Sequence, residues 1–177
     1  MTDDKDKWYM VTLIGKDRMG IVSHVTSALY ENGANLGETS MMRLGGNFSI
    51  MMMVEFSGSR KELHDALSSV TDSLALHLHI DKIKAELHKH YIPDVRVSVY
   101  GADRSGIVSK VTSILDQAGL YILDLESDVA GDEEKPLYIM HIEGQAKQGI
   151  SSLESALQII KELGVDAELV EIDTLIA

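Results

Sequence analysis

The sequence contains no cysteine, and this absence excludes three kinds of chemistry. A disulfide framework, a thiolate metal site and a cysteine nucleophile all require the missing residue. Apolar runs are also short, since none approaches the roughly 18 residues of a membrane-spanning helix. The first ten residues, MTDDKDKWYM, are charged and lack the apolar core of a signal peptide. These absences predict a cytoplasmic protein that does not enter a membrane.

Basic residues are scarce as well. Sixteen lysines and arginines stand against 28 aspartates and glutamates, which gives a formal net charge of −12. Residues 1–90 carry 10 basic and 12 acidic groups, whereas residues 91–177 carry 6 and 16. Because nucleic-acid-binding proteins cluster Lys and Arg against phosphates, we expect no direct contact with DNA or RNA. The acidic second half is most simply a solvated surface, with a basic protein partner as the minority alternative.

Catalytic motifs are missing too. The chain has no P-loop, no Gly-x-Ser-x-Gly elbow and no His-Glu-x-x-His pattern, so we expect no enzyme and no cofactor. The pairs His77/His79 and His88/His90 have the spacing that places two side chains on one strand face, where they could hold a transition metal. Without cysteine or an obvious third ligand, exposed strand and linker histidines are the preferred interpretation. A metal sensor stays an alternative.

The chain does contain a long internal repeat. Residues 15–33 read GKDRMGIVSHVTSALYENG and residues 101–119 read GADRSGIVSKVTSILDQAG, with 12 of 19 positions identical. The period of 86 residues is too long for a solenoid and has the size of a small domain. The sequence therefore predicts a tail at 1–7 and a duplicated domain at 8–90 and 91–177.

Each copy shows the same order of elements, βαββαβ. Strands are indicated by aromatic and β-branched residues, helices by apolar residues at helical spacing, and the tight hairpin of the first copy by Gly45-Gly46-Asn47. We expect strands at 8–14, 35–44, 48–56, 76–87, 94–100, 121–130, 137–143 and 165–173, and helices at 19–32, 60–74, 105–118 and 150–163. This order predicts two α+β, ferredoxin-like domains, each an antiparallel four-stranded sheet with helices on one face.

The candidate binding site is the turn between the first strand and the first helix. Backbone N–H groups at a helix N-terminus favour anions such as a carboxylate, and Gly20 or Gly106 would let a ligand approach the backbone. The Asp17 carboxylate in the same loop could pair with an ammonium, so the loop suits both charges of an amino acid. The competing interpretation is structural, because Asp17 and Asp103 are also good N-caps.

These residues resemble a known family. The motif D-R-x-G-I-V after a strand, and Gly33-Ala34-Asn35-Leu36 after the helix, are similar to the ACT domain, a module that senses amino acids and related metabolites. The tandem arrangement resembles the glycine cleavage system transcriptional repressor family. The resemblance implies a ligand between two modules, and it assigns the following candidates: Asp17, Arg18, Met19, Gly20, Ile21 and Asn35, with Asp103, Arg104 and Gly106 in the second copy. Met19 and Ser105 replace a proline that family loops often have. Tyr121 replaces Asn35, which favours the first copy as the ligand site.

The resemblance also implies a function. We expect a regulator that binds an amino acid such as glycine and contacts a transcription-regulator protein without binding DNA itself. A ligand-independent dimerising adaptor and a detached regulatory subunit of an amino-acid biosynthetic enzyme stay as alternatives. Methionines 41, 42 and 51–53 put apolar groups on both faces of adjacent strands. A sheet with helices on one side should have a polar second face, so we expect this face to be covered by the other domain or by a second subunit of a homodimer.

Overall fold

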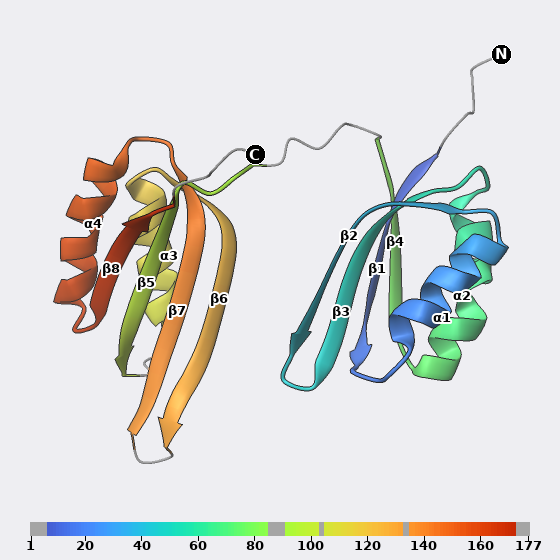
Figure 1. Cartoon of the computed structure of the whole chain (residues 1–177), viewed down its shortest axis with the longest axis horizontal. Coiled ribbons are helices and arrows are strands. Elements are labelled where there is room, and N and C mark those ends of the chain that lie inside the picture. Colours follow the sequence, from blue (N-terminus) through green and yellow to red (C-terminus); the bar gives the residue numbers. More distant parts are fainter. Residues whose placement is uncertain (1–6, 85–90, 103–104, 133–134, 173–177) are drawn as a thin grey trace. The chain divides into compact units, whose positions relative to one another are not determined.

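The computed structural model describes residues 7–84, 91–102, 105–132 and 135–172. The chain divides into two compact units, Met1–His88 and Lys89–Ala177 (Figure 1). Most of the expected tail, the pair His88/His90, and the site candidates Asp103 and Arg104 lie outside the described residues. Each unit is treated by itself below.

Both units have the predicted order of elements. The first contains β1 (Trp8–Lys16), α1 (Ile21–Glu31), β2 (Asn35–Leu44), β3 (Asn47–Glu55), α2 (Arg60–Leu74) and β4 (His77–Ile83). The second contains β5 (Val95–Ala102), α3 (Ile107–Gln117), β6 (Leu120–Asp132), β7 (Lys135–Ala146), α4 (Ile150–Glu162) and β8 (Asp166–Glu171). The ferredoxin-like βαββαβ prediction is confirmed in both copies.

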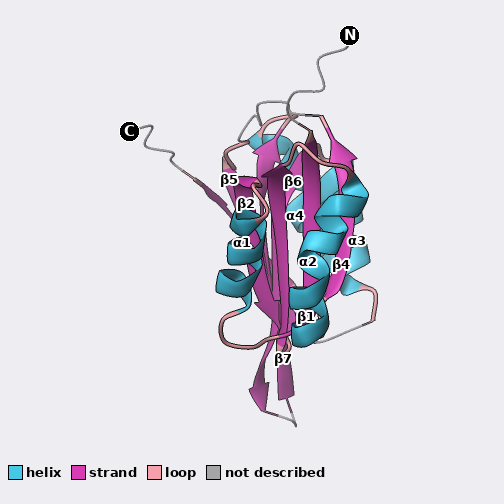
Figure 2. Ribbon diagram, turned by 90° about the vertical axis from the view of Figure 1, so that its right-hand side faces the viewer, coloured by secondary structure: helices cyan, strands magenta, loops and turns pink. Residues whose placement is uncertain are grey.

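The two sheets share one topology. Their strand orders are β2-β3-β1-β4 and β6-β7-β5-β8, and neighbouring strands are antiparallel throughout. In the first unit, α1 and α2 lie side by side on one face of the sheet (Figures 1 and 2). The other face of that sheet has no helix among the described residues.

Strand alternation builds each core. Along β1, Tyr9, Val11 and Leu13 are buried under the helices, and their neighbours point to the opposite face. Facing helix residues such as Val25, Leu29, Leu63 and Leu67 complete the first core. The second core has the same construction, with Val95, Val97 and Val99 on β5 and Val111, Leu115, Leu153 and Leu157 on the helices. Each such side chain contributes about 1.5–3 kcal/mol when fully buried.

The hairpin of the second unit differs from the expectation. The segment 131–136 was predicted as a loop because Gly131 and Pro136 punctuate it, yet β6 and β7 continue through it with the register Gly131↔Pro136 and Asp132↔Lys135. Pairing of β7 with β5 ends at Ala102↔Leu137. Pro136 therefore pairs with one strand only, where a proline is tolerated.

Candidate functional site

The loop after β1 is held by the β2–β3 hairpin. The Asp17 backbone N–H donates to the carbonyl of Gly46 at 3.0 Å, and Asp17 Oδ2 lies 3.1 Å from Arg43 Nε. Asp17 Oδ1 is buried and accepts no hydrogen bond from the described residues. The N-cap of α1 is Gly20, so the interpretation of Asp17 as the helix cap is wrong. Asp17 instead anchors the loop to the hairpin.

Both helices that follow this loop begin at a glycine. Gly20 has φ of 88° and Gly106 has φ of 82°, the left-handed region that favours glycine, and neither helix has a side-chain cap from the described residues, which leave out Asp103 and Arg104. The first-turn N–H groups of α1 and α3 are therefore not satisfied by a capping side chain. This leaves at both helix starts the anion-binding character that the sequence suggested.

The remaining first-copy candidates divide by exposure. Met19 is 99% exposed and Arg18 is also exposed, so both side chains are available to a partner or ligand. Ile21 is 2% exposed and packs in the core, so its backbone N–H is the group that could face a ligand. Ser105, the counterpart of Met19, is exposed as well.

His24 covers the start of α1. Its Nδ1 lies 2.6 Å from the carbonyl oxygen of Gly20, and a Cβ added at Gly20 would lie 3.0 Å from the ring. The repeat places Lys110 at the corresponding position of α3, and a Cβ at Gly106 would have no neighbour within 4 Å among the described residues. Sequence reasoning missed His24 and Lys110, although their position four residues after the N-cap glycine was the available signal.

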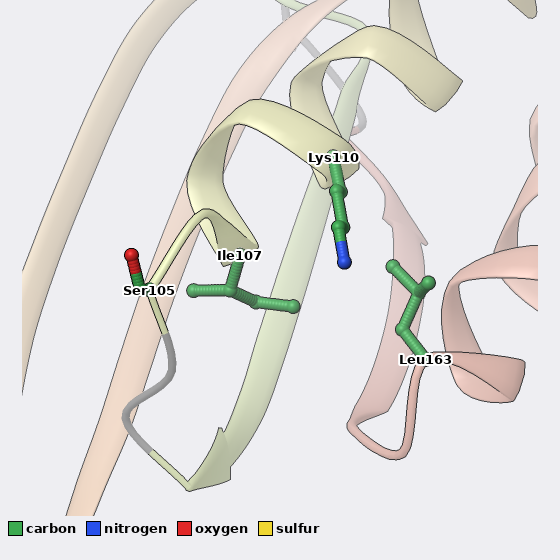
Figure 3. Close-up of a pocket in the computed structure, with 4 residues that line it drawn as sticks. All are labelled: Ser105, Ile107, Lys110 and Leu163. Carbon is green, nitrogen blue, oxygen red and sulfur yellow. The ribbon is translucent and has the colours of Figure 1, made fainter.

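A small cavity lies beside the start of α3. Its volume is about 110 Å³, and its lining residues are Ser105, Ile107, Lys110 and Leu163. Figure 3 shows the side chains of Ile107, Lys110 and Leu163 pointing toward one another. Leu163 is the C-cap residue of α4, so the cavity joins two elements that are far apart in the sequence. The cavity combines an ammonium, an uncapped helix start and an apolar wall.

Asn35 lies away from the loop of its own unit. It is the first residue of β2, and its Nδ2 donates to Glu55 Oε2 at 3.1 Å. Glu55 pairs with Trp8, at the start of β1, whereas Lys16 pairs with Asn47 at the other end. The 11 residues of α1 span about 16 Å between these two ends. The first unit therefore does not bring Asn35 and Gly20 together at one small ligand.

The counterpart of Asn35 has another environment. The Tyr121 ring packs edge-to-face on Tyr91 with a centroid distance of 5.5 Å, and the Lys147 ammonium lies 5.6 Å from the Tyr121 centroid. This arrangement stabilises the start of β6 through aromatic and cation–π contacts. It offers no amide to a ligand in place of Asn35.

The histidine pair of β4 is the candidate metal site within the described residues. His77 and His79 point to the same face of β4, as predicted, and His79 Nε2 lies 2.9 Å from Asp81 Oδ2. Within the described ranges no three His, Cys, Asp or Glu side chains are grouped to hold a metal. In the same ranges no helix has the length and apolar character to cross a membrane.

Comparison with known proteins identifies relatives of each copy and of the pair. The ACT domain model matches residues 8–81 and again 94–170. The UPF0237 protein YjhC of Lactococcus lactis subsp. lactis is 36% identical over 83 residues, which make up 45% of this chain and 95% of YjhC. The glycine cleavage system transcriptional repressor of Escherichia coli is 24% identical over 144 residues, 81% of this chain and 76% of the repressor. A solved structure of an unknown protein from Galdieria sulphuraria matches with a TM-score of 0.73 at 25% identity, covering 96% of this chain and 100% of that chain.

Proposed function

This chain belongs to the ACT domain family and is related to the glycine cleavage repressors, and we propose that it is a non-enzymatic, amino-acid-responsive regulator of that type. One observation carries the proposal. In both copies the strand–helix loop ends at a glycine with positive φ, and no side chain of the described residues caps the helix that follows. Such a start presents backbone N–H groups to a carboxylate without competition from a capping side chain.

Each of the two loops has one charged group that suits one end of an amino acid. At α3, the Lys110 ammonium adds a second positive group for a ligand carboxylate. At α1, the unused Asp17 Oδ1 lies in the loop that a ligand ammonium would approach. The cavity of about 110 Å³ is far smaller than the roughly 300–1,000 Å³ sites of drug-sized ligands. Glycine and other small amino acids therefore fit the proposal best.

The contribution of Asn35 follows from its place in the sheet. Because Asn35 and Gly20 lie at opposite ends of the first unit, a small ligand that contacts both must take them from the first units of two chains. A ligand bound in this way stabilises one association of the chains over another, which is how binding could change the surface that a partner meets.

Calorimetric titration of the full chain with glycine, alanine, serine and larger amino acids tests ligand binding. We expect small amino acids to bind and Lys110→Met or Asp17→Asn to weaken the affinity at least several-fold. Lys82→Met, which removes an exposed strand lysine of the first unit, is the matched control and should bind normally. The proposal fails if no amino acid binds at millimolar concentration, or if the control variant loses as much affinity as Lys110→Met.

The proposed partner is a DNA-binding transcription regulator, and this chain would not touch DNA. The formal charge of −12 supports the absence of direct DNA contact, since a phosphate backbone would repel such a surface. Affinity purification with and without glycine separates the candidates. A transcription regulator whose recovery changes with glycine supports the proposal. A biosynthetic enzyme as the partner would favour the detached regulatory subunit instead.

A further inference from the structure

The first sheet has an apolar outer face. Outward positions are those that alternate with the buried residues of each strand. Gly37 lies against the Trp8 ring and Met53 on this face, since a Cβ added there would touch both. The outward positions also include Thr12, Ser40, Ser49 and Asn47. We define the methionine face by six apolar members: Trp8, Met10, Met42, Leu44, Met51 and Met53. Its members belong to β1, β2 and β3, which are hydrogen-bonded neighbours.

This face has no cover within its own unit. Both α1 and α2 lie on the opposite side of the sheet (Figures 1 and 2). Met42 is 57% exposed, Met51 47% and Leu44 70%. An antiparallel sheet with one bare face normally carries polar side chains there. A contiguous apolar face of three strands therefore indicates an interaction surface.

The open face of the second sheet has the opposite character. Its outward positions include six carboxylates, at Asp124, Glu126, Asp128, Glu143, Asp166 and Glu168. Polar side chains there bond to one another: Arg96 Nε donates to Glu143 Oε1 at 2.8 Å, and Ser98 Oγ lies 2.9 Å from His141 Nδ1. Carboxylates pressed onto methionines would lose their water without gaining partners, which is strongly unfavourable. An apolar occupant therefore suits the methionine face better than a charged one.

The charges around the methionine face show how a second copy would fit. Lys16 and His77 lie at the end of the sheet where β1 finishes, and Glu55 and Asp81 lie toward the end where β1 begins. All four are at outward positions in the register. Two identical faces can meet in two ways. If β1 of one copy runs parallel to β1 of the other, the acidic ends of the two faces lie together. If the two β1 strands run antiparallel, Lys16 of one copy lies over the Glu55 end of the other. Charge complementarity selects the antiparallel arrangement.

We propose that the methionine face is a homodimer interface, packed against the same face of a second copy with the strands of the two sheets antiparallel. A twofold axis in the plane of the interface and perpendicular to the strands generates this contact, so the patch is self-complementary. Aligned sheets pack with strand directions within about 30° of each other. Trp8 of each copy then lies near Ile14 and Lys16 of its mate. The proposal does not depend on ligand binding.

Sedimentation equilibrium of the full chain tests the interface. We expect wild-type protein to have the mass of a dimer at micromolar to millimolar concentration. Met51→Glu and Met42→Glu should each raise the dimer dissociation constant at least tenfold, because each buries a carboxylate between apolar surfaces. Val170→Glu is the matched control, since Val170 is an exposed strand residue on the open face of the other sheet. This control should not change the dissociation constant.

A charge exchange tests the antiparallel arrangement. Lys16→Glu and Glu55→Lys should each weaken the dimer, and the double variant should restore it. Asn35→Ala controls for the lost Asn35–Glu55 hydrogen bond and should leave the dimer intact.

Far-UV circular dichroism checks that each variant is folded, and Met42→Glu replaces Met51→Glu if the latter unfolds. A wild-type chain that is monomeric at all concentrations overturns the proposal, as does equal loss of dimer in Val170→Glu. Failure of the double variant to recover overturns the antiparallel arrangement.

Discussion

The two N-cap glycines form a natural matched pair for substitution by alanine. Gly20 and Gly106 have φ of 88° and 82°. Within the part of the chain that the structure describes, the new Cβ would meet a neighbour at Gly20, the His24 ring at 3.0 Å, and none at Gly106. We expect Gly106→Ala to destabilise its unit through backbone strain alone, by about 1–2 kcal/mol. Gly20→Ala should cost about 1 kcal/mol more, because the ring must move and lose its hydrogen bond to the Gly20 carbonyl.

Chemical denaturation followed by circular dichroism measures both costs, and a double-mutant cycle isolates the ring. In a His24→Ala background the cost of Gly20→Ala should fall to that of Gly106→Ala, because the contacting ring is then missing. In a thermal scan, about 1 kcal/mol corresponds to a shift of roughly 4–8 °C for a unit of 60–100 residues. Equal costs for the two glycines in the wild-type background would refute the assignment of His24 as the cover of the first helix start.

Three further predictions concern other contacts. A double-mutant cycle of Asp17→Asn and Arg43→Met on the free energy of unfolding should give a coupling of about 0.2–1 kcal/mol, because Arg43 is largely exposed. A coupling of zero would mean that the Asp17 N–H alone anchors the loop to the hairpin. Hydrogen bonds from the backbone and side chain of Ser59 lower the pKa of Glu62 in the folded protein. The stabilisation that ionised Glu62 gives is therefore complete above its unfolded pKa and is lost as the pH falls through its lower folded pKa. Glu62→Gln should remove this part of the acid loss of stability, and an unfolding stability that falls with acid as in wild type would contradict the assignment. Leu67→Ala should cost about 2–5 kcal/mol, read from the fluorescence of Trp8, the single tryptophan; a cost below that range would show that the cavity collapses.

The sequence predicted the fold well because its signals are local and occur twice. The first helix ends close to Gly33 and the hairpin turns at Gly45-Gly46, where positive φ is required, and both were assigned from glycine alone. The capping box of Ser59 and Glu62 likewise fixes the start of α2 at the predicted residue. The hairpin of the second unit was mispredicted because Gly131 and Pro136 are compatible with paired strands as well as with a loop.

The candidate site was less accessible to sequence reasoning, because its parts meet only in three dimensions. Asp17 has the composition of an N-cap, but its oxygen partner is Arg43, 26 positions along the chain. Leu163 reaches the start of α3 from the end of α4, and no motif connects them. Asn35 and Gly20 lie at opposite ends of the first unit, separated by about the length of α1, and the resemblance assigned them to one ligand only between two modules.

The two copies have kept one scaffold and changed what each exposes. At the helix start, His24 lies over its glycine, whereas Lys110 leaves its glycine open beside a cavity. On the open sheet faces, one copy presents methionines and the other presents carboxylates. From these differences we infer one division of labour. The first copy associates with a second chain, and the second copy, and not the first copy that Asn35 favoured, receives the ligand carboxylate more readily. Exchanging His24 and Lys110 separates the two roles, since the exchange should move ligand affinity toward the first copy and leave dimerisation unchanged.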